Sequence, residues 1–222
     1  MSERIDWREE VPVSSRYDDP YYSLNGGLDE TRHVFLDGND LPARFRPGFH
    51  IAELGFGTGL NALAAWALWR ESGQDGTLAF TSFEAHPLGA DEMARALAAF
   101  PTLAPLAADL CEAWATGTRE IALPGLSLHV IEGPAEKTLP PWRGRADAWF
   151  LDGFSPAKNP ALWSDTILSQ VGGHTAPGGT AATYSAAGHV RRALADAGFE
   201  VARIPGFERK RHMTRAWMPQ GL

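Results

Sequence analysis

The sequence is poor in cysteine and has no long apolar run, and both absences narrow what the protein can be. Its 222 residues include a single cysteine, Cys111, which excludes an internal disulfide and favours a reducing compartment. No stretch is long and apolar enough to cross a membrane, and the start at Met1 lacks the apolar segment of a secretion signal. The seven histidines lack the spacing of a metal site. We therefore expect a cytoplasmic protein with no membrane contact and no metal.

Composition predicts a single core and an acidic surface. With 44% hydrophobic and 21% charged residues, the chain can bury one substantial core. The formal net charge of −7 weighs against nucleic acid as a partner, because binding phosphates requires a positive surface. One segment near the end is nevertheless basic, with Arg209, Lys210 and Arg211 in succession close to Phe207. It is a candidate for contacting a nucleic-acid backbone, and a solvated hairpin tip is the alternative.

From residue 49 onward, short apolar runs alternate with helical segments. This order predicts a doubly wound α/β fold with a mostly parallel sheet, closed by an antiparallel pair of strands at one edge. We expect strands over 49–52, 78–84, 126–133, 146–152, 180–185, 200–204 and 214–218, and helices over 60–70, 90–100, 103–114 and 188–197.

Residues 1–48 are predicted to form a small β-rich extension ahead of a Rossmann-like domain over 49–222. Alternation over 32–36 suggests a strand, and Asp37-Gly38-Asn39 suggests a hairpin turn after it. The tyrosines of 17–22 are expected to pack against the core.

The stretch over 53–61, Glu-Leu-Gly-Phe-Gly-Thr-Gly-Leu-Asn, is where a ligand is expected. It lies between an apolar strand and a helix, and its glycines allow backbone N–H groups to approach a bound molecule closely. Dinucleotide-binding enzymes use G-x-G-x-x-G, whereas here the spacing is G-x-G-x-G with Glu53 two places before Gly55. That version suits S-adenosylmethionine, whose ammonium group can be held by an acidic partner.

A second acidic residue, Glu84, ends the next predicted strand, where a ribose-binding carboxylate is expected. A glycine-rich turn alone also occurs without a ligand, but the strand, the helix and both carboxylates together favour the cofactor. The predicted cofactor-binding residues of this region are Glu53, Gly55, Phe56, Gly57, Thr58, Gly59, Asn61 and Glu84.

The second informative stretch is Asp-Gly-Phe-Ser-Pro-Ala-Lys-Asn-Pro over 152–160, at the carboxyl end of a predicted central strand. Such a strand end lies beside the expected methyl group, so Asp152 is the candidate catalytic residue. It could orient an amine by hydrogen bonds, accept its proton, or merely cap the loop. The candidates for holding a substrate are Phe154, Pro156, Lys158 and Asn159, with ordinary core, turn and surface roles as the alternatives.

Four segments, 17–36, 53–61, 151–160 and 188–213, resemble one family. They are similar to the methyltransferase domain of the bifunctional tRNA 5-methylaminomethyl-2-thiouridine biosynthesis enzyme and to its stand-alone counterparts. The resemblance implies a class I S-adenosylmethionine-dependent methyltransferase. Its reaction would convert 5-aminomethyl-2-thiouridine at the tRNA wobble position to 5-methylaminomethyl-2-thiouridine. It also implies that Asp152 is catalytic and that Arg209, Lys210 and Arg211 help to engage the anticodon region of tRNA.

The sequence departs from the family pattern in two places. The bifunctional members continue into a flavin-dependent domain, but no second nucleotide-binding turn follows here. We therefore expect no FAD in this chain, and a separate flavoprotein or upstream tRNA-modification enzyme to supply the amine. Many members also carry an acidic residue where Pro134 stands. Adenine recognition is therefore assigned to the backbone of Gly133 or Ala135, or to the side chain of Glu132 or Glu136, without a choice among them.

Three other functions stay open on the sequence alone. A methyltransferase acting on a small amine fits the acidic net charge. A nicotinamide-dependent oxidoreductase is a different class, disfavoured by the glycine spacing and by Glu53. A tRNA-binding module without catalysis is disfavoured because the glycine turn and Asp152 are both present.

Overall fold

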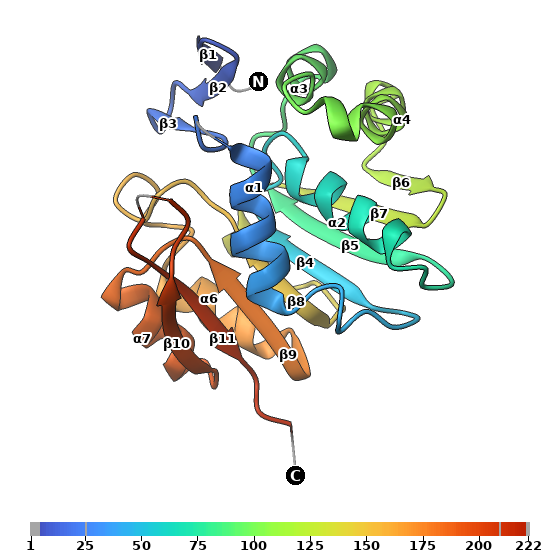
Figure 1. Cartoon of the computed structure of the whole chain (residues 1–222). Helices are drawn as coiled ribbons and strands as arrows, with labels where there is room; N and C mark the ends of the chain where they lie inside the picture. The colour runs from blue at the N-terminus through green and yellow to red at the C-terminus, as the bar shows by residue number, and fades with distance from the viewer. Residues whose placement is uncertain (1–4, 25, 209, 221–222) are drawn as a thin grey trace.

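The computed structural model describes residues 5–24, 26–208 and 210–220, and these residues form a large mixed sheet of eight strands (Figure 1). The strand order is β10-β11-β9-β8-β4-β5-β7-β6. The five central strands are parallel, whereas β6 at one edge and β11 near the other run antiparallel to their neighbours. The strands are β4 His50–Leu54, β5 Leu78–Glu84, β6 Glu120–Leu123, β7 Leu126–Glu132, β8 Ala146–Leu151, β9 Thr175–Thr183, β10 Glu200–Pro205 and β11 His212–Trp217.

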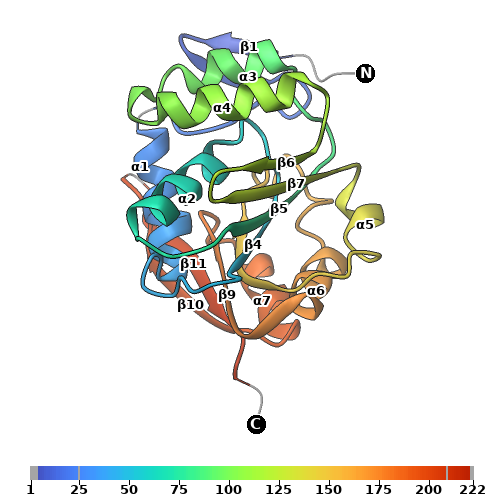
Figure 2. The same ribbon diagram turned by 90° about the vertical axis from the view of Figure 1, so that its right-hand side faces the viewer.

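Helices cover both faces of the sheet (Figures 1 and 2). Because successive side chains of a strand point to opposite faces, Phe150 of β8 joins one apolar core while Trp149 and Leu151 join the other. The first core is covered by α2 Leu60–Glu71, α3 Ala90–Leu97, η3 Pro101–Leu103 and α4 Ala104–Ala115, and the second by α5 Ala135–Thr138, α6 Asp165–Gly173 and α7 Gly188–Asp196. The class I methyltransferase architecture predicted from the sequence is therefore present.

The N-terminal part combines a small sheet with helical turns. Three short antiparallel strands come first, and a helical segment then packs on the first core. These elements are β1 Ile5–Arg8, β2 Val11–Ser14, β3 Asp19–Pro20, α1 Gly27–Thr31, η1 Arg32–Leu36 and η2 Asp37–Asn39.

The predicted strand over 32–36 and hairpin turn over 37–39 are wrong, since both segments are helical. A half-buried strand would expose every second residue, but Val34, Phe35 and Leu36 are all buried. Asn39 is buried as well, and its amide donates to the carbonyl oxygen of Phe35 at 2.9 Å. Residues of this segment belong to the first core. The division of the chain into an extension over 1–48 and a domain over 49–222 stays a prediction.

The remaining predicted strands and helices are present, most of them within two residues of their predicted ends. The sequence analysis does not predict β6, α5 or α6. Strand β9 starts at Thr175 instead of after the Pro-Gly-Gly turn, and its pairing with β8 shifts register between Ala146 and Ala148. Gly178 has φ +72°, so the turn is absorbed as an irregularity inside the strand.

Among the described residues, none of the individual helices has the length and apolar composition needed to span a membrane. Only α3 taken together with η3 and α4 meets the length and composition of a span, and that pair is bent by 115°.

Candidate active site

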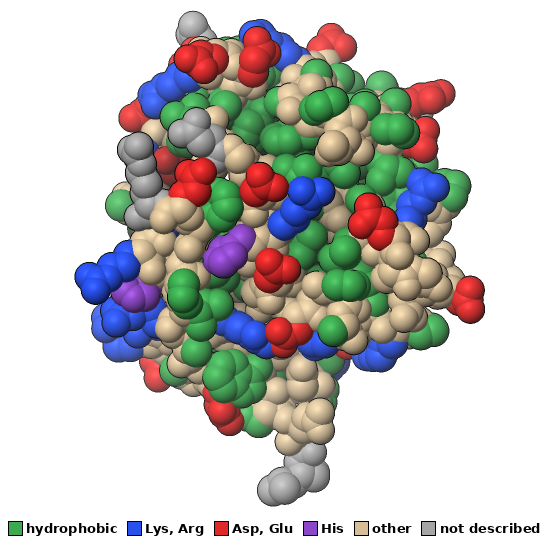
Figure 3. Space-filling model, in the orientation of Figure 1, with side chains coloured by type: hydrophobic (Ala, Val, Ile, Leu, Met, Phe, Trp, Pro, Cys, Tyr) green, Lys and Arg blue, Asp and Glu red, His purple; other side chains and the backbone are tan. Residues whose placement is uncertain are grey.

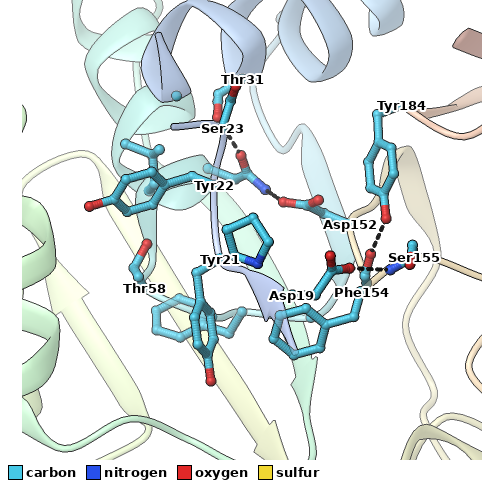
Figure 4. A pocket seen from close by; sticks show the side chains of 18 of the residues that line it. Asp19, Tyr21, Tyr22, Ser23, Thr31, Thr58, Asp152, Phe154, Ser155 and Tyr184 are labelled. Atoms are coloured by element: carbon cyan, nitrogen blue, oxygen red, sulfur yellow. Dashed lines mark hydrogen bonds between the residues drawn. The ribbon is translucent and has the colours of Figure 1, made fainter. Parts of the chain in front are cut away.

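A cavity of about 530 Å³ lies at the carboxyl ends of β4, β5 and β8 (Figure 4). The chain leaves β4 toward β5 on one side and returns as β8 on the other, so strand order reverses at this point. Loops diverge where the order reverses, and doubly wound sheets bind ligands in the resulting crevice. The turn after β4 and the loop after β8 line this cavity.

The glycine turn after β4 is conformationally restricted and closely packed. Gly55, Gly57 and Gly59 have φ values of +91°, +53° and +79°, a region that favours glycine. A Cβ on Gly55 would lie 2.3 Å from the carbonyl oxygen of Asp152, so the two loops touch through their backbones. The backbone N–H of Gly57 donates to Glu84 Oε2 at 3.0 Å, which brings the acidic end of β5 to the turn.

Below the cavity, the amide of Asn61 joins two carboxyl groups. Its Nδ2 donates to Glu53 Oε1 at 2.9 Å and to Asp152 Oδ2 at 2.6 Å. Its Oδ1 accepts from Thr31 Oγ1 at 2.9 Å, which fixes the direction in which the amide points. Ser82 Oγ donates to the second oxygen of Glu53 at 2.7 Å. We call Thr31, Asn61, Glu53 and Asp152 the carboxyl network; the dashes in Figure 4 show how it reaches Asp152.

Both carboxyl groups of the network hold protons more tightly than usual. Loss of surrounding water raises the pKa of Asp152 to about 7, opposed by the hydrogen bond from Asn61, and Glu30 raises it further. Full burial raises the pKa of Glu53 to about 8, against the hydrogen bonds from Ser82 and Asn61. Asp152 keeps some exposure to the cavity, whereas Glu53 has none. Asp152 is therefore the carboxyl group that can meet a substrate and exchange a proton near neutral pH.

An aromatic wall borders the cavity beside the glycine turn. The ring of Phe154 stacks on Tyr17 at 4.8 Å between centroids and meets Tyr21 edge-on at 5.1 Å. The carboxylate of Asp19 accepts from the backbone N–H of Ser155 at 2.9 Å, which ties β3 to the loop after β8. Figure 4 shows Tyr21, Asp19 and Phe154 on the same side of the hollow. The small N-terminal sheet thus completes the cavity.

Lys158 and Lys210 each form ion pairs beside the cavity. Lys158 Nζ donates to the carbonyl oxygen of Asp18 and lies 3.5 Å from Asp19 Oδ1. Lys210 Nζ contacts Glu30 Oε1 at 2.6 Å and lies 4.3 Å from the centre of the Tyr184 ring. Both ammonium groups are therefore already paired with acidic side chains of the N-terminal part.

Comparison with known proteins agrees with this geometry. Residues 101–219, more than half of the chain, match the family described as S-adenosyl-L-methionine-dependent methyltransferases. The chain belongs to this family. A nicotinamide-dependent oxidoreductase, the alternative from another class, is thereby set aside. S-adenosylmethionine dependence, predicted from the glycine spacing, is confirmed at the level of the family.

The relatives of this methyltransferase named here are longer proteins than the chain itself. Over 96% of its length it is 50% identical to the tRNA 5-methylaminomethyl-2-thiouridine biosynthesis bifunctional protein MnmC of Caulobacter vibrioides. It is 44% identical over 96% of its length to the protein of the same name from Marinobacter nauticus. The chain spans only 38% and 36% of these two relatives. The predicted resemblance to the methyltransferase domain of the bifunctional enzyme is confirmed.

Solved structures confirm the fold. MNMC2 from Aquifex aeolicus matches all of this methyltransferase at a TM-score of 0.78 and 27% identity, over 73% of that chain. Precorrin-6y C5,15-methyltransferase from Geobacter metallireducens matches 94% of it at a TM-score of 0.54 and 13% identity, over 93% of that chain. The second match speaks for the fold alone.

The cavity of the methyltransferase fits the cofactor of its family. The turn admits no larger side chain than glycine, since its glycines have positive φ and a Cβ on Gly57 would lie 3.1 Å from the Tyr21 ring. Glu84 lies at the end of β5, at the place of a ribose-binding carboxylate. A volume of about 530 Å³ is in the range of small-molecule sites. These groups are suited to a ligand that carries a ribose and an ammonium group.

The structure divides the predicted site residues into two groups. Those that line the cavity are Gly55, Phe56, Gly57, Thr58, Asn61, Glu84, Asp152, Phe154, Asn159 and Lys210. Those that do not line it are Glu53, Gly59, Glu132, Gly133, Pro156, Lys158 and Arg211. Arg209 lies outside the described residues. None of these roles is tested by the family match, so each stays a prediction.

Three placements differ from the simplest expectation. Glu53 lies behind Asn61, so no surface of its side chain faces the cavity. Glu132 pairs with Arg119 at 2.5 Å outside the cavity, whereas Ala135 lines it. Lys158 contacts the N-terminal strand in place of an open surface.

Several lining residues are absent from the predicted site. They are Tyr17, Asp19, Tyr21, Glu30, Thr31 and Tyr184. The aromatic-rich stretch over 17–22 is a signal that could have found three of them, but the sequence analysis assigns its tyrosines to packing. Thr31 has no such signal, because its partner Asn61 is thirty residues away.

Proposed function

We propose that this methyltransferase converts 5-aminomethyl-2-thiouridine at the wobble position of tRNA to 5-methylaminomethyl-2-thiouridine. The observation that carries the proposal is the position of Asp152, between the glycine turn and the aromatic wall, with its carboxyl group open to the cavity. The names of the relatives specify biosynthesis of this nucleoside in tRNA, and the chain matches them over 96% of its length.

The amine sets the chemical demand on the site. Its nitrogen must present a neutral lone pair, but an alkyl amine with a pKa of about 10.4 is mostly protonated near neutral pH. Asp152, whose pKa is raised to about 7, is a better proton acceptor than an ordinary aspartate. Its carboxylate also orients the amine by hydrogen bonds, which restricts the direction of approach. Asp152 thus serves as the orienting group and the proton acceptor.

The cofactor supplies an electrophilic methyl group on its sulfonium when bound. On this proposal the backbone of Gly55 and Gly57 holds its amino-acid end, and Glu84 accepts hydrogen bonds from its ribose hydroxyls. Since Glu132 is paired elsewhere, adenine recognition falls to the backbone near Ala135. Phe154 offers its ring to the uracil base, because planar aromatic rings stack on flipped-out bases.

A labelling experiment tests the proposal directly. Labelled methyl is supplied as S-adenosylmethionine, together with tRNA from cells that lack this activity or from cells that retain it. We expect label only in the first tRNA pool, in the wobble nucleoside. Label in neither pool, with cofactor binding intact, would refute the tRNA substrate.

A small-molecule amine is the second candidate substrate, and the cavity itself gives a reason for it. Five acidic residues line it, and an acidic wall attracts any compact cation. These residues are Asp19, Glu30, Glu84, Asp152 and Glu208. Turnover of a tRNA substrate should fall steeply as salt rises, whereas turnover of a small amine should change little.

Two partner predictions belong to the same proposal. The anticodon region of tRNA is the expected macromolecular partner. The amine is expected from a separate flavoprotein or an upstream tRNA-modification enzyme, and no FAD is expected in this chain. Reconstitution with such a flavoprotein and unmodified tRNA, followed by nucleoside analysis, tests this part.

A further inference from the structure

Near the cavity lies a cationic surface of which the sequence analysis identifies only Arg211. It consists of Arg191 of α7, Arg203 of β10, and Arg211 with His212 at the start of β11. Arg203 pairs with Thr214 and Pro205 pairs with His212, so Arg203 and His212 are diagonal neighbours on one face of the hairpin. Such neighbours lie about 7–8 Å apart. We call this group the α7–hairpin surface.

Packing of α7 brings the third arginine to the same place. Val201 and Ala216 lie on the hairpin face of Arg203 and share the second core with Val190 of α7. Arg191 therefore follows directly at the edge of that contact. The pKa of His212 is lowered first by partial burial and then by the charges of Arg203, Arg211 and Arg191, as expected when the guanidinium groups surround the ring. Figure 3 shows Lys and Arg side chains gathered around a histidine at the left, where Figure 1 places α7 and β10.

The arginines of this surface have no acidic partner. Within residues 5–24, 26–208 and 210–220, no carboxylate lies within ion-pair distance of Arg191, Arg203 or Arg211. Arg46 and Arg119, by contrast, each pair with a carboxylate. The Nε of Arg191 is buried without a hydrogen-bond partner. An uncompensated positive cluster in a protein of net charge −7 indicates an anionic partner.

The surface is continuous with the cavity through one turn. Residues 206–211 connect β10 to β11, and Phe207, Glu208 and Lys210 of this turn line the cavity. Lys210 is paired with Glu30, whereas Arg211 and the two arginines behind it have no carboxylate within ion-pair distance among the described residues. A base that enters the cavity must leave its backbone phosphates outside, next to this turn. Guanidinium groups are suited to bind such phosphates in bidentate fashion.

We propose that the α7–hairpin surface binds the RNA backbone flanking the nucleotide that enters the cavity. This inference rests on the proposed tRNA substrate and adds where the polynucleotide lies. It also reassigns the predicted basic segment, because Lys210 serves the cavity wall while Arg211 acts together with Arg191 and Arg203. An anionic lipid surface would use the same charges, but it would not need a deep cavity beside them.

The test uses the whole protein, S-adenosylmethionine and tRNA from cells that lack the modification. The double variant Arg203→Gln/Arg211→Gln should bind this tRNA about tenfold more weakly at 100 mM salt. Its plot of log affinity against log salt should lose about one to two units of slope, since each phosphate contact contributes roughly 0.7–0.9. Cofactor affinity should stay unchanged.

Matched variants separate a phosphate contact from a general loss of charge. Arg143→Gln/Arg145→Gln removes two exposed charges from the loop before β8, at the amino ends of the parallel strands and therefore at the end opposite the cavity, and should bind tRNA like the wild type. Arg203→Lys/Arg211→Lys should retain most of the affinity and exclude misfolding as the cause.

Three outcomes would overturn the inference in distinguishable ways. If the wild type binds and methylates tRNA and the Gln double variant binds it equally well, the surface is not the docking site although the function stands. If the wild type neither binds nor methylates tRNA, the proposed function itself fails. If phosphatidylserine vesicles bind the wild type as tightly as tRNA does, and the double variant loses both, the surface is a lipid site.

Discussion

Polar side chains beneath the cavity, here called the floor, are largely buried, whereas those beside it, here called the rim, are partly exposed. The floor is the carboxyl network, in which Glu53 is fully buried and the pKa values of both its acids are raised. At the rim, Asp18, Asp19 and Lys158 form ion pairs with 76%, 20% and 38% of their side chains exposed. Water replaces a hydrogen bond less readily in the floor than at the exposed rim. Position, more than residue type, therefore decides which polar contacts control the chemistry.

The largest effect is expected from Asp152→Asn in the floor. The amide neither accepts the proton of the amine nor carries the charge that orients it, so methyl transfer should fall by about 10²-fold or more. S-adenosylmethionine affinity, measured by calorimetry, should stay within about threefold of the wild type. Near-normal turnover would remove Asp152 from the catalytic role.

Thr31→Val tests whether the floor depends on the direction of the Asn61 amide. Without the hydroxyl donor, the amide can turn its oxygen toward the carboxyl groups, which would raise the pKa of Asp152 further. We expect kcat/KM to drop about tenfold near pH 7 and its acidic limb to move to higher pH. Thr31→Ser keeps the donor and should restore both values. A Thr31→Val profile that overlays the wild type would show that Asn61 is held by other contacts.

Glu53→Gln separates stability from catalysis in the same floor. The pKa of Glu53 is raised from 4.5 to about 8 on folding, so its contribution to stability is full below about pH 4.5 and is lost as pH rises through 8. The variant lacks this titration. The Tm of the variant should therefore rise relative to that of the wild type between pH 6 and 9. Each kcal/mol of stability that the wild type loses in this range corresponds to about 2–4 °C. Exposed Glu71→Gln is the control and should follow the wild type at every pH.

The smallest effect is expected at the rim. Lys158→Gln removes ion pairs to Asp18 and Asp19 that are partly exposed, and such pairs contribute about 0–1 kcal/mol. We expect Tm to change by less than about 3 °C and kcat/KM by less than about twofold. A tenfold loss of kcat/KM would indicate that Lys158 contacts substrate directly, as the sequence analysis proposes. The rim would then affect catalysis as the floor does.

Much of the fold is predictable because its signals are local. The glycine turn between β4 and α2, the apolar run of β8 and each strand of the closing pair β10 and β11 can be recognised within about ten residues. The helical segment over 32–39 is mispredicted because its three buried apolar residues are consecutive and do not alternate with polar ones, and the sheet beneath decides how they pack. Local periodicity does not reveal which face a distant element will cover.

The sequence by itself determined the central strands, the positive-φ glycines and the position of Asp152 at a strand end, because each depends on nearest neighbours along the chain. Only the tertiary structure decided that Thr31 orients Asn61, that Lys210 pairs with Glu30, and that Arg191, Arg203 and Arg211 gather around His212. Those contacts join residues up to 180 positions apart. Their geometry depends on how helices and strands pack across the sheet, and pattern within one element does not encode it.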